Sequence, residues 1–287
     1  MQQSDILGRW QGAACVLATM HGKERVITSV VNEALGLEVV VPQSFDTDTF
    51  GTFTRDVKRH GDQLQAARAK ANAAMDLSGI DIALASEGSF GQHPQLPFLP
   101  SNLEVVVLVD RKQGIEVVGQ ARASHPRGEG QLVRSADEAV EVATSWGFPE
   151  QGVIVRHSKD SNRHIYKEIA TATELRESSE RLLAGWLRTS VYLETDMRAH
   201  RCPARMNNIR AATADLVANC KRTCPSCSAP GFVVKGVVRG LPCELCGIAT
   251  DGVKEQIYAC SVCTYEVAVP QADRETASAA ECQRCNP

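Results

Sequence analysis

The last quarter of the sequence contains Cys224-Pro-Ser-Cys227, Cys243-Glu-Leu-Cys246, Cys260-Ser-Val-Cys263 and Cys282-Gln-Arg-Cys285, four cysteine pairs with identical internal spacing. Intervals of 15, 13 and 18 residues separate the pairs. Two residues between cysteines allow one tight turn to aim both thiolates at a single ion, and two such turns complete a tetrahedral four-thiolate site. The sequence therefore predicts two structural zinc ions held by all eight of these cysteines.

Two other uses of the cysteines are open. Disulfides would suit an exported protein, but the first residues do not have the pattern of a signal peptide. Iron-sulfur ligation fits the spacing less well, because a cluster motif usually places three cysteines within one short run. The spacing does not determine which pairs share an ion.

Composition limits the classes of partner. The chain has 287 residues, of which 43% are hydrophobic and 23% charged, with a net charge of -3, and these values are typical of a globular protein. Its apolar runs are too short to span a membrane, so we expect a cytoplasmic protein. Nucleic-acid binding needs an excess of basic residues, and residues 221–287 carry seven basic and seven acidic side chains. We therefore expect no nucleic-acid partner.

The cysteine-rich tail has no open metal coordination position once eight thiolates hold two ions. A catalytic zinc site keeps one position free for water, so this composition favours a structural role or a docking role. The partner would be another protein or a second copy of the chain.

Upstream of the tail, strand and helix patterns alternate, which is typical of an α/β domain with a mixed sheet. Apolar strands are predicted over 14–18, 37–41 and 80–84, and a hairpin over 104–119. Helices are predicted over 24–35, 64–78, 135–145, 175–187 and 203–219. We predict an α/β domain over 1–202, a connecting helix over 203–220 and a zinc-binding domain over 221–287.

Three predicted loops carry polar side chains: 19–24 with Lys23, 86–91 with Glu87, and 194–201. Ligands of open α/β sheets bind beyond the carboxyl ends of the strands, so we expect these loops to bind a phosphate-containing small molecule. Each loop also has a structural interpretation: a solvated first helical turn, a carboxylate that caps a neighbouring helix, and a surface network of salt bridges.

The order of these segments resembles the inosine/xanthosine triphosphate pyrophosphatase superfamily, whose members hydrolyse non-canonical nucleoside triphosphates. The family loop Ala-Thr-x-Asn-x-x-Lys is similar to the segment with Ala18-Thr19, His21 and Lys23. The helix motif Glu-Asn-Ala-x-x-Lys-Ala is similar to Gln65-Ala-Ala-Arg-Ala-Lys70-Ala71. The acidic turn and the His-Arg segment correspond to Ala85-Ser-Glu87-Gly-Ser-Phe-Gly91 and Arg198-Ala-His200-Arg201.

This resemblance implies an ITPase-like fold and a hydrolase that acts on phosphoanhydride bonds. Thr19, Lys23 and Lys70 would then hold phosphates, and Glu87 would position Mg²⁺ or the attacking water. Arg198 and His200 would stabilise charge on the leaving group.

The sequence departs from that family at the metal ligands, because Gln65 stands where the family has an acidic residue and Glu87 is the turn's single carboxylate. The alternative is a non-catalytic module that senses a nucleotide or binds a protein, with structural zinc ribbons. The whole chain also resembles an uncharacterised bacterial family that joins Ala-Thr-Met-His-Gly-Lys-Glu and Asp-Met-Arg-Ala-His segments to a cysteine-rich tail. That family suggests no activity.

Overall fold

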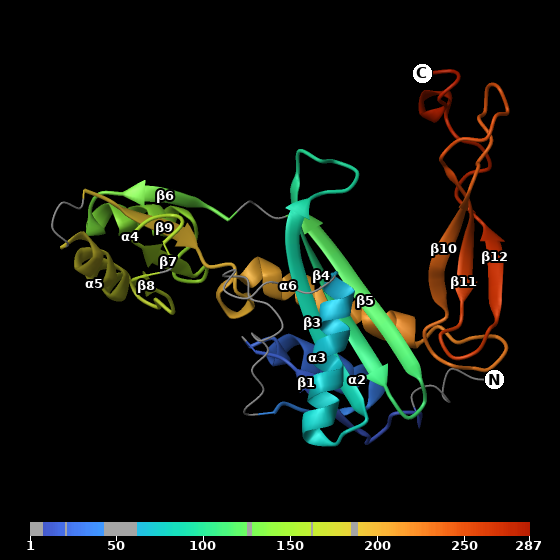
Figure 1. Ribbon diagram of the computed structural model, residues 1–287, viewed down its shortest axis with the longest axis horizontal. Coiled ribbons are helices and arrows are strands. Elements are labelled where there is room, and N and C mark those ends of the chain that lie inside the picture. The colour runs from blue at the N-terminus through green and yellow to red at the C-terminus, as the bar shows by residue number, and fades with distance from the viewer. Residues whose placement is uncertain (1–7, 21, 43–61, 125–127, 162, 185–188) are drawn as a thin grey trace.

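The computed structural model describes residues 8–20, 22–42, 62–124, 128–161, 163–184 and 189–287. Its central element is a five-stranded sheet in the order β2-β1-β3-β4-β5 (Figure 1). In that order the strands span Glu38–Val40, Ala14–Ala18, Ile82–Gln92, Pro100–Asp110 and Ile115–Ser124. Strand β1 pairs in parallel with β2 and β3, whereas β3, β4 and β5 pair antiparallel. The predicted mixed sheet is confirmed.

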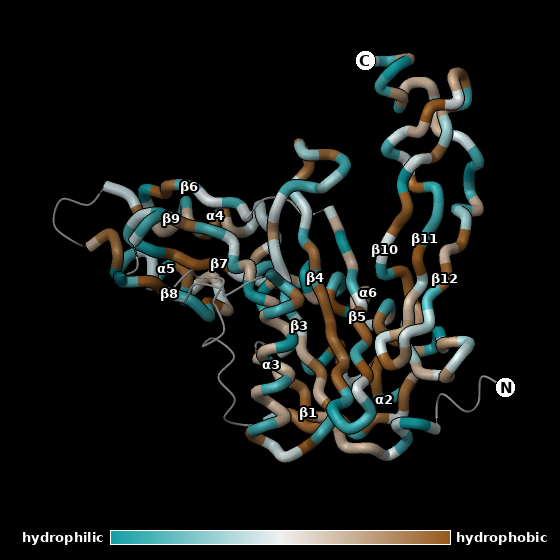
Figure 2. The backbone as a smooth tube through the Cα atoms, turned by 45° about the vertical axis from the view of Figure 1, so that its right-hand side comes forward, coloured by the Kyte–Doolittle hydropathy of each residue, from teal (hydrophilic) through white to brown (hydrophobic). Residues whose placement is uncertain are grey.

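Helices cover both faces of this sheet. Helix α3 (Gln63–Ser78) packs on one face, and α2 (Glu24–Leu35) and α6 (Pro203–Cys220) pack together on the other (Figure 1). Hydrophobic residues are concentrated along β1 and β4, and the turn after β4 is hydrophilic (Figure 2). Helices α2 and α3 end at Gly36 and Gly79, whose φ angles of +67° and +71° suit a residue without a side chain.

One predicted loop is wrong. Residues 86–91 do not form a loop, because β3 continues without a break to Gln92. Its register with β4 runs from Ile82 opposite Asp110 to Gln92 opposite Pro100. Glycine is common in turns, but a strand also accepts it, and at Gly88 the side chains of Glu104 and Arg205 approach the backbone closely. Glu87 therefore lies on a strand, and its side chain points to one face of the sheet.

A second sheet is formed by strands that follow the central sheet in the sequence. Its four strands have the order β6-β9-β7-β8 and span Gly130–Val133, Val191–Thr195, Val153–Arg156 and Ile165–Tyr166. Helices α4 (Ala136–Ser145) and α5 (Ala172–Leu183) contact these strands and share a separate hydrophobic core with them. Thus the region predicted as one α/β domain contains two sheets with separate cores.

The tail forms a third sheet of antiparallel strands β10 (Val233–Arg239), β11 (Val253–Ala259) and β12 (Glu266–Pro270). None of the residues in these three strands is buried. The predicted connecting helix is α6, which contacts β5, β4 and α2 before the chain enters the tail. The boundaries at 202 and 220 stay predictions.

Within the described ranges, none of the helices combines the length and hydropathy that a membrane-spanning helix needs.

Strand β5 and helix α6 approach closely at Gly119. A Cβ atom placed on Gly119 would lie 2.2 Å from the Leu216 nitrogen and 2.3 Å from the Ala212 oxygen. Both are backbone atoms of α6, which cannot move aside as a flexible side chain can. Glycine at this position therefore sets the distance between the helix and the sheet.

We expect Gly119→Ala to lower the free energy of unfolding by about 3 kcal/mol, because the added methyl group forces α6 away from the sheet. Urea unfolding followed by circular dichroism measures this change. The matched control is Gly91→Ala, a strand position where a Cβ atom meets nothing within 4 Å, and it should change stability by less than about 0.5 kcal/mol. Equal effects of the two substitutions would contradict the close contact.

Candidate functional site

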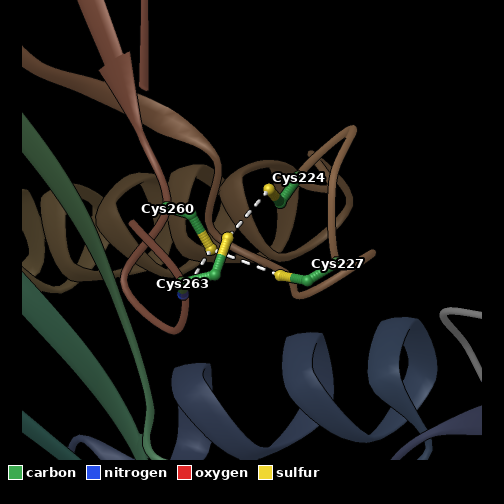
Figure 3. Close-up of side chains that lie close together, drawn as sticks. All are labelled: Cys224, Cys227, Cys260 and Cys263. Atoms are coloured by element: carbon green, nitrogen blue, oxygen red, sulfur yellow. Dashed lines mark hydrogen bonds between the residues drawn. The ribbon is translucent and has the colours of Figure 1, made fainter. Parts of the chain in front are cut away.

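The first cysteine group contains Cys224, Cys227, Cys260 and Cys263. Their sulfur atoms all lie within 4.8 Å of one another and point toward a common centre (Figure 3). The Sγ atoms of Cys224 and Cys263 are 3.7 Å apart, and those of Cys227 and Cys260 are 3.6 Å apart. Four converging thiolates can hold one metal ion.

The second group contains Cys243, Cys246, Cys282 and Cys285, also within 4.8 Å of one another. The two groups are interleaved along the chain, because the first pair joins the third and the second pair joins the fourth. Strands β10 and β11 run between the two groups, so the groups lie at opposite ends of the tail sheet. The eight predicted ligands thus form two sites, each of which could hold a metal ion.

Short backbone turns orient the thiols. The Ser228, Gly247 and Asn286 nitrogens each donate to the carbonyl of the first cysteine of their pair, at 2.8 to 2.9 Å. Ser228 and Gly247 have φ angles of +60° and +69°, so the chain reverses immediately after the second cysteine. Peptide N–H groups also reach sulfur, as in the 3.4 Å contact from the Leu245 nitrogen to Cys243 Sγ. These turns explain why two residues separate the cysteines of a pair.

A cluster of buried charged side chains lies at the end of β1 in the central sheet. Lys70 of α3 forms an ion pair with Glu87 of β3, and these two side chains are 8% and 4% exposed. Lys23, which precedes α2, donates from Nζ to the Ser86 hydroxyl at 3.1 Å and to the Ser86 carbonyl at 3.4 Å. The structure therefore brings together three residues that the sequence predicts for the site.

Two further members of this cluster are not among the residues that the sequence predicts for the site. Arg205 of α6 donates from Nε to Glu104 Oε1 of β4 at 2.6 Å, and these side chains are 1% and 0% exposed. Asn102 also donates to the same oxygen, at 3.0 Å. A signal existed for each residue: Arg205 occupies a core-facing position of α6, and Glu104 directly precedes an apolar run.

The two ion pairs lie on opposite faces of β3. Neighbouring residues of a strand point to opposite faces, so Glu87 faces α3, whereas Gly88 and its cross-strand partner Glu104 face α6. Lys23 lies at the edge of β3, where β1 has ended: the last β1 residue, Ala18, pairs with Ala85. The side chain of Lys23 thus lies beside both pairs.

Lys23 carries the surplus charge of the cluster. Among the described residues of the cluster, three cations (Lys23, Lys70 and Arg205) accompany two carboxylates, each of which has its own cationic partner. In the described part of the chain, no carboxylate forms an ion pair with Lys23. Burial, followed by the Arg205 charge, lowers the pKa of Lys23 to about 8, against the opposing effects of the two glutamates. An anion at this position would restore the balance.

Arg198 and His200 form a separate cluster. Arg198 is bonded to the buried Asp196 through two guanidinium nitrogens and also to Glu168. The His200 ring contacts both Glu168 oxygens at 3.1 Å. Burial acts to raise the pKa of Glu168, but the His200 hydrogen bond and the Arg198 charge outweigh it and lower that pKa.

This second cluster adjoins the first through the backbone. The Met197 carbonyl accepts a 2.9 Å hydrogen bond from Arg205 Nη1, and a Cβ atom on Gly22 would lie 3.4 Å from the His200 Cβ. Thr19 donates from its hydroxyl to the Met20 carbonyl at 3.1 Å, and His21 lies outside the described residues. Arg198 and His200 are thus near the loop before α2, but their side chains contact Asp196 and Glu168.

Helix α3 uses its two glutamines differently. The Gln65 side chain accepts from the Asp62 nitrogen at 2.9 Å as part of a capping box, so it caps the helix. Gln63 instead donates to the Glu87 and Leu103 carbonyls, at 2.6 and 2.9 Å. The side chain of Gln65 is therefore bound to the backbone at the N-terminus of the helix.

Comparisons with known proteins give a family and a weak structural likeness. The model of a family described as "Domain of unknown function (DUF6671)" matches residues 70–287, more than half of the chain. No curated protein matches. The crystal structure of protein VC0702 from Vibrio cholerae is similar at 8% sequence identity and a TM-score of 0.33, over 72% of this chain and 94% of that chain. A likeness this weak supports no inference about function.

We expect Arg205→Met to lower the free energy of unfolding by about 3–5 kcal/mol, because it leaves Glu104 as a buried carboxylate without its cation. Adding Glu104→Gln should recover part of that loss. The control is Arg111→Met, which breaks an exposed 2.7 Å pair with Asp76 and should cost less than about 1 kcal/mol. Urea unfolding compares the three variants, and equal losses for Arg205→Met and Arg111→Met would contradict the buried pair.

Proposed function

We propose that this chain, which belongs to the DUF6671 family of unknown function, binds a phosphate-containing small molecule at Lys23 and that this ligand is a nucleotide. The observation that carries the proposal is the surplus positive charge of the cluster at the end of β1. A buried ammonium whose hydrogen bonds go to the neutral oxygens of Ser86 is costly, because the two nearby glutamates are paired with Lys70 and Arg205 and compensate its loss of hydration only in part. A phosphate group would supply that charge.

The location supports the proposal. Ligands of α/β sheets bind at the carboxyl ends of parallel strands, and Lys23 lies at the carboxyl end of β1, beside its parallel neighbour β3. The peptide N–H groups at the start of α2 also favour an anion at this edge. Lys70, Glu87 and Arg205 surround the position from three further elements.

Binding without hydrolysis is the form of the proposal that we favour. A pyrophosphatase of the superfamily that this sequence resembles would need carboxylates free to hold Mg²⁺. Glu87 is paired with Lys70, Glu104 is paired with Arg205, and Gln65 caps α3. Hydrolysis remains the second candidate, because Glu87 lies within the same cluster as both lysines.

We also propose that each cysteine group holds one zinc ion with a structural role. Four thiolates complete a tetrahedral shell and leave no position for a catalytic water. The tail strands bury none of their residues, so metal binding would supply the folding free energy that an apolar core supplies elsewhere.

We expect the purified protein to contain two zinc ions per chain and the Cys285→Ser variant to contain one, because each group needs four thiolates. Elemental analysis by mass spectrometry measures both values. Cys202→Ser is the matched control: Cys202 is a buried cysteine outside both groups, and its replacement should leave two ions. A wild-type protein without zinc, or loss of zinc in the Cys202 variant, would contradict the assignment.

We expect Lys23→Met to weaken binding of tripolyphosphate and ATP at least tenfold, since a charged hydrogen bond to phosphate is lost while the volume of the side chain is kept. Wild-type binding should also weaken as the pH rises above about 8, because the ammonium of Lys23 loses its proton there. Isothermal titration calorimetry measures both effects.

The control for this experiment is Lys112→Met, whose exposed side chain pairs with Asp81 and should not affect binding. Equal affinities of the Lys23 variant and the wild type would contradict the proposed function. A pyrophosphate-release assay with Mg²⁺ separates the two candidates: turnover that Glu87→Gln abolishes would favour the hydrolase, whereas binding without release supports the form that we favour.

A further inference from the structure

The face of β3 that points toward α6 presents Ser86, Gly88 and Phe90 in succession, because alternate residues of a strand share a face. This part of β3 pairs with β4 on one side, and its pairing with β1 ends at Ala85. The segment therefore extends past the central sheet's parallel region, with Lys23 bonded to its first residue, Ser86.

Arg205 connects the Lys23 end of this face to Phe90. A Cβ atom on Gly88 would lie 2.5 Å from Arg205 Nη2 and 2.3 Å from Glu104 Oε1, so the ion pair lies directly over the glycine. The guanidinium carbon is 5.8 Å from the centre of the Phe90 ring, a cation–π distance. Glu104 fixes Arg205, and Arg205 in turn holds the ring.

Phe90 differs from its neighbours on this face in its exposure. Ser86 is 2% exposed, whereas Phe90 is 38% exposed. A partly exposed aromatic ring on the same strand face as the Ser86 end, where Lys23 supplies a surplus positive charge, resembles the layout of sites in which a ring stacks on a base while cations hold the phosphates. From Ser86 to Phe90 the strand advances about 13 Å, at about 3.3 Å per residue, a length suited to an extended nucleoside polyphosphate.

We propose that Phe90 is the platform on which the base of a nucleoside triphosphate stacks, with Arg205 as the residue that positions the ring. This inference rests on the proposed phosphate site at Lys23 and names the ligand class more closely: a polyphosphate that carries a heteroaromatic base. Stacking tolerates any base, because each has a π face, so such a platform would accept purine and pyrimidine nucleotides alike.

The experiment compares two probes, ATP and tripolyphosphate, which share the phosphate chain and differ in the base. In calorimetric titrations, Phe90→Leu should weaken ATP binding about tenfold and leave tripolyphosphate binding unchanged, because leucine keeps apolar volume but has no π face. Phe98→Leu is the matched control: Phe98 is 75% exposed in the same β3–β4 hairpin, and its replacement should change neither affinity.

A second variant distinguishes loss of stacking from misfolding of the Phe90→Leu protein. Phe90→Trp should retain ATP affinity, and its added tryptophan fluorescence should be quenched by ATP but not by tripolyphosphate. If Phe90→Leu lowers the affinities for ATP and tripolyphosphate equally, or lowers neither, Phe90 only packs against Arg205, and a stacking role for its ring is excluded. If tripolyphosphate binds to the wild type but ATP binds no better, the platform fails while the phosphate site stands. If ATP alone binds and depends on Phe90, the phosphate site fails while the platform stands.

Discussion

The central sheet is constrained by the early end of β1. That strand stops at Ala18, opposite Ala85, while β3 continues to Gln92. The edge of β3 beyond this point is occupied by the side chain of Lys23, which bonds to Ser86. A buried ammonium at a strand edge requires compensation, and the carboxylates on the two faces of β3 already have cations of their own. The low pKa of Lys23 follows from this arrangement, and so does the place that we propose for an anionic ligand.

The tail has little apolar burial in its sheet. None of the residues in its three strands is buried, so apolar burial orders these strands less than it orders the central sheet. Two groups of four cysteines lie at the ends of the tail sheet, and we propose that metal ions bound there hold its strands together. Each group joins cysteines that are distant in the chain. The first group joins cysteines before β10 to cysteines after β11, and the second joins cysteines before β11 to cysteines after β12. A metal ion in either group would therefore close a loop across the sheet. The first group is also next to the central sheet, since a Cβ atom on Gly231 would lie 3.0 Å from Val117.

Periodic segments were predictable from sequence, and contacts between distant residues were not. The helix over 24–35 and the strand over 14–18 have the expected bounds, because apolar spacing and a terminal glycine define them locally. The prediction of a loop over 86–91 is wrong because glycine suits both a turn and a strand whose backbone is approached closely by other side chains, as at Gly88. Arg205 and Glu104 escaped detection because their pairing spans 101 positions. The grouping of the cysteine pairs is equally non-local: the spacing alone allows any two pairs to share an ion.

We propose that an anion binds at the buried ammonium of Lys23, and the titration of Lys23 tests this proposal most directly. Nuclear magnetic resonance of the Lys23 side chain, assigned by comparison with Lys23→Met, gives its pKa with and without inorganic phosphate. We expect a pKa of about 8 in the free protein and a rise when phosphate binds, because the anion stabilises the protonated form. A Lys23 that titrates near the usual lysine value of about 10.4, or whose pKa does not respond to phosphate, would contradict it.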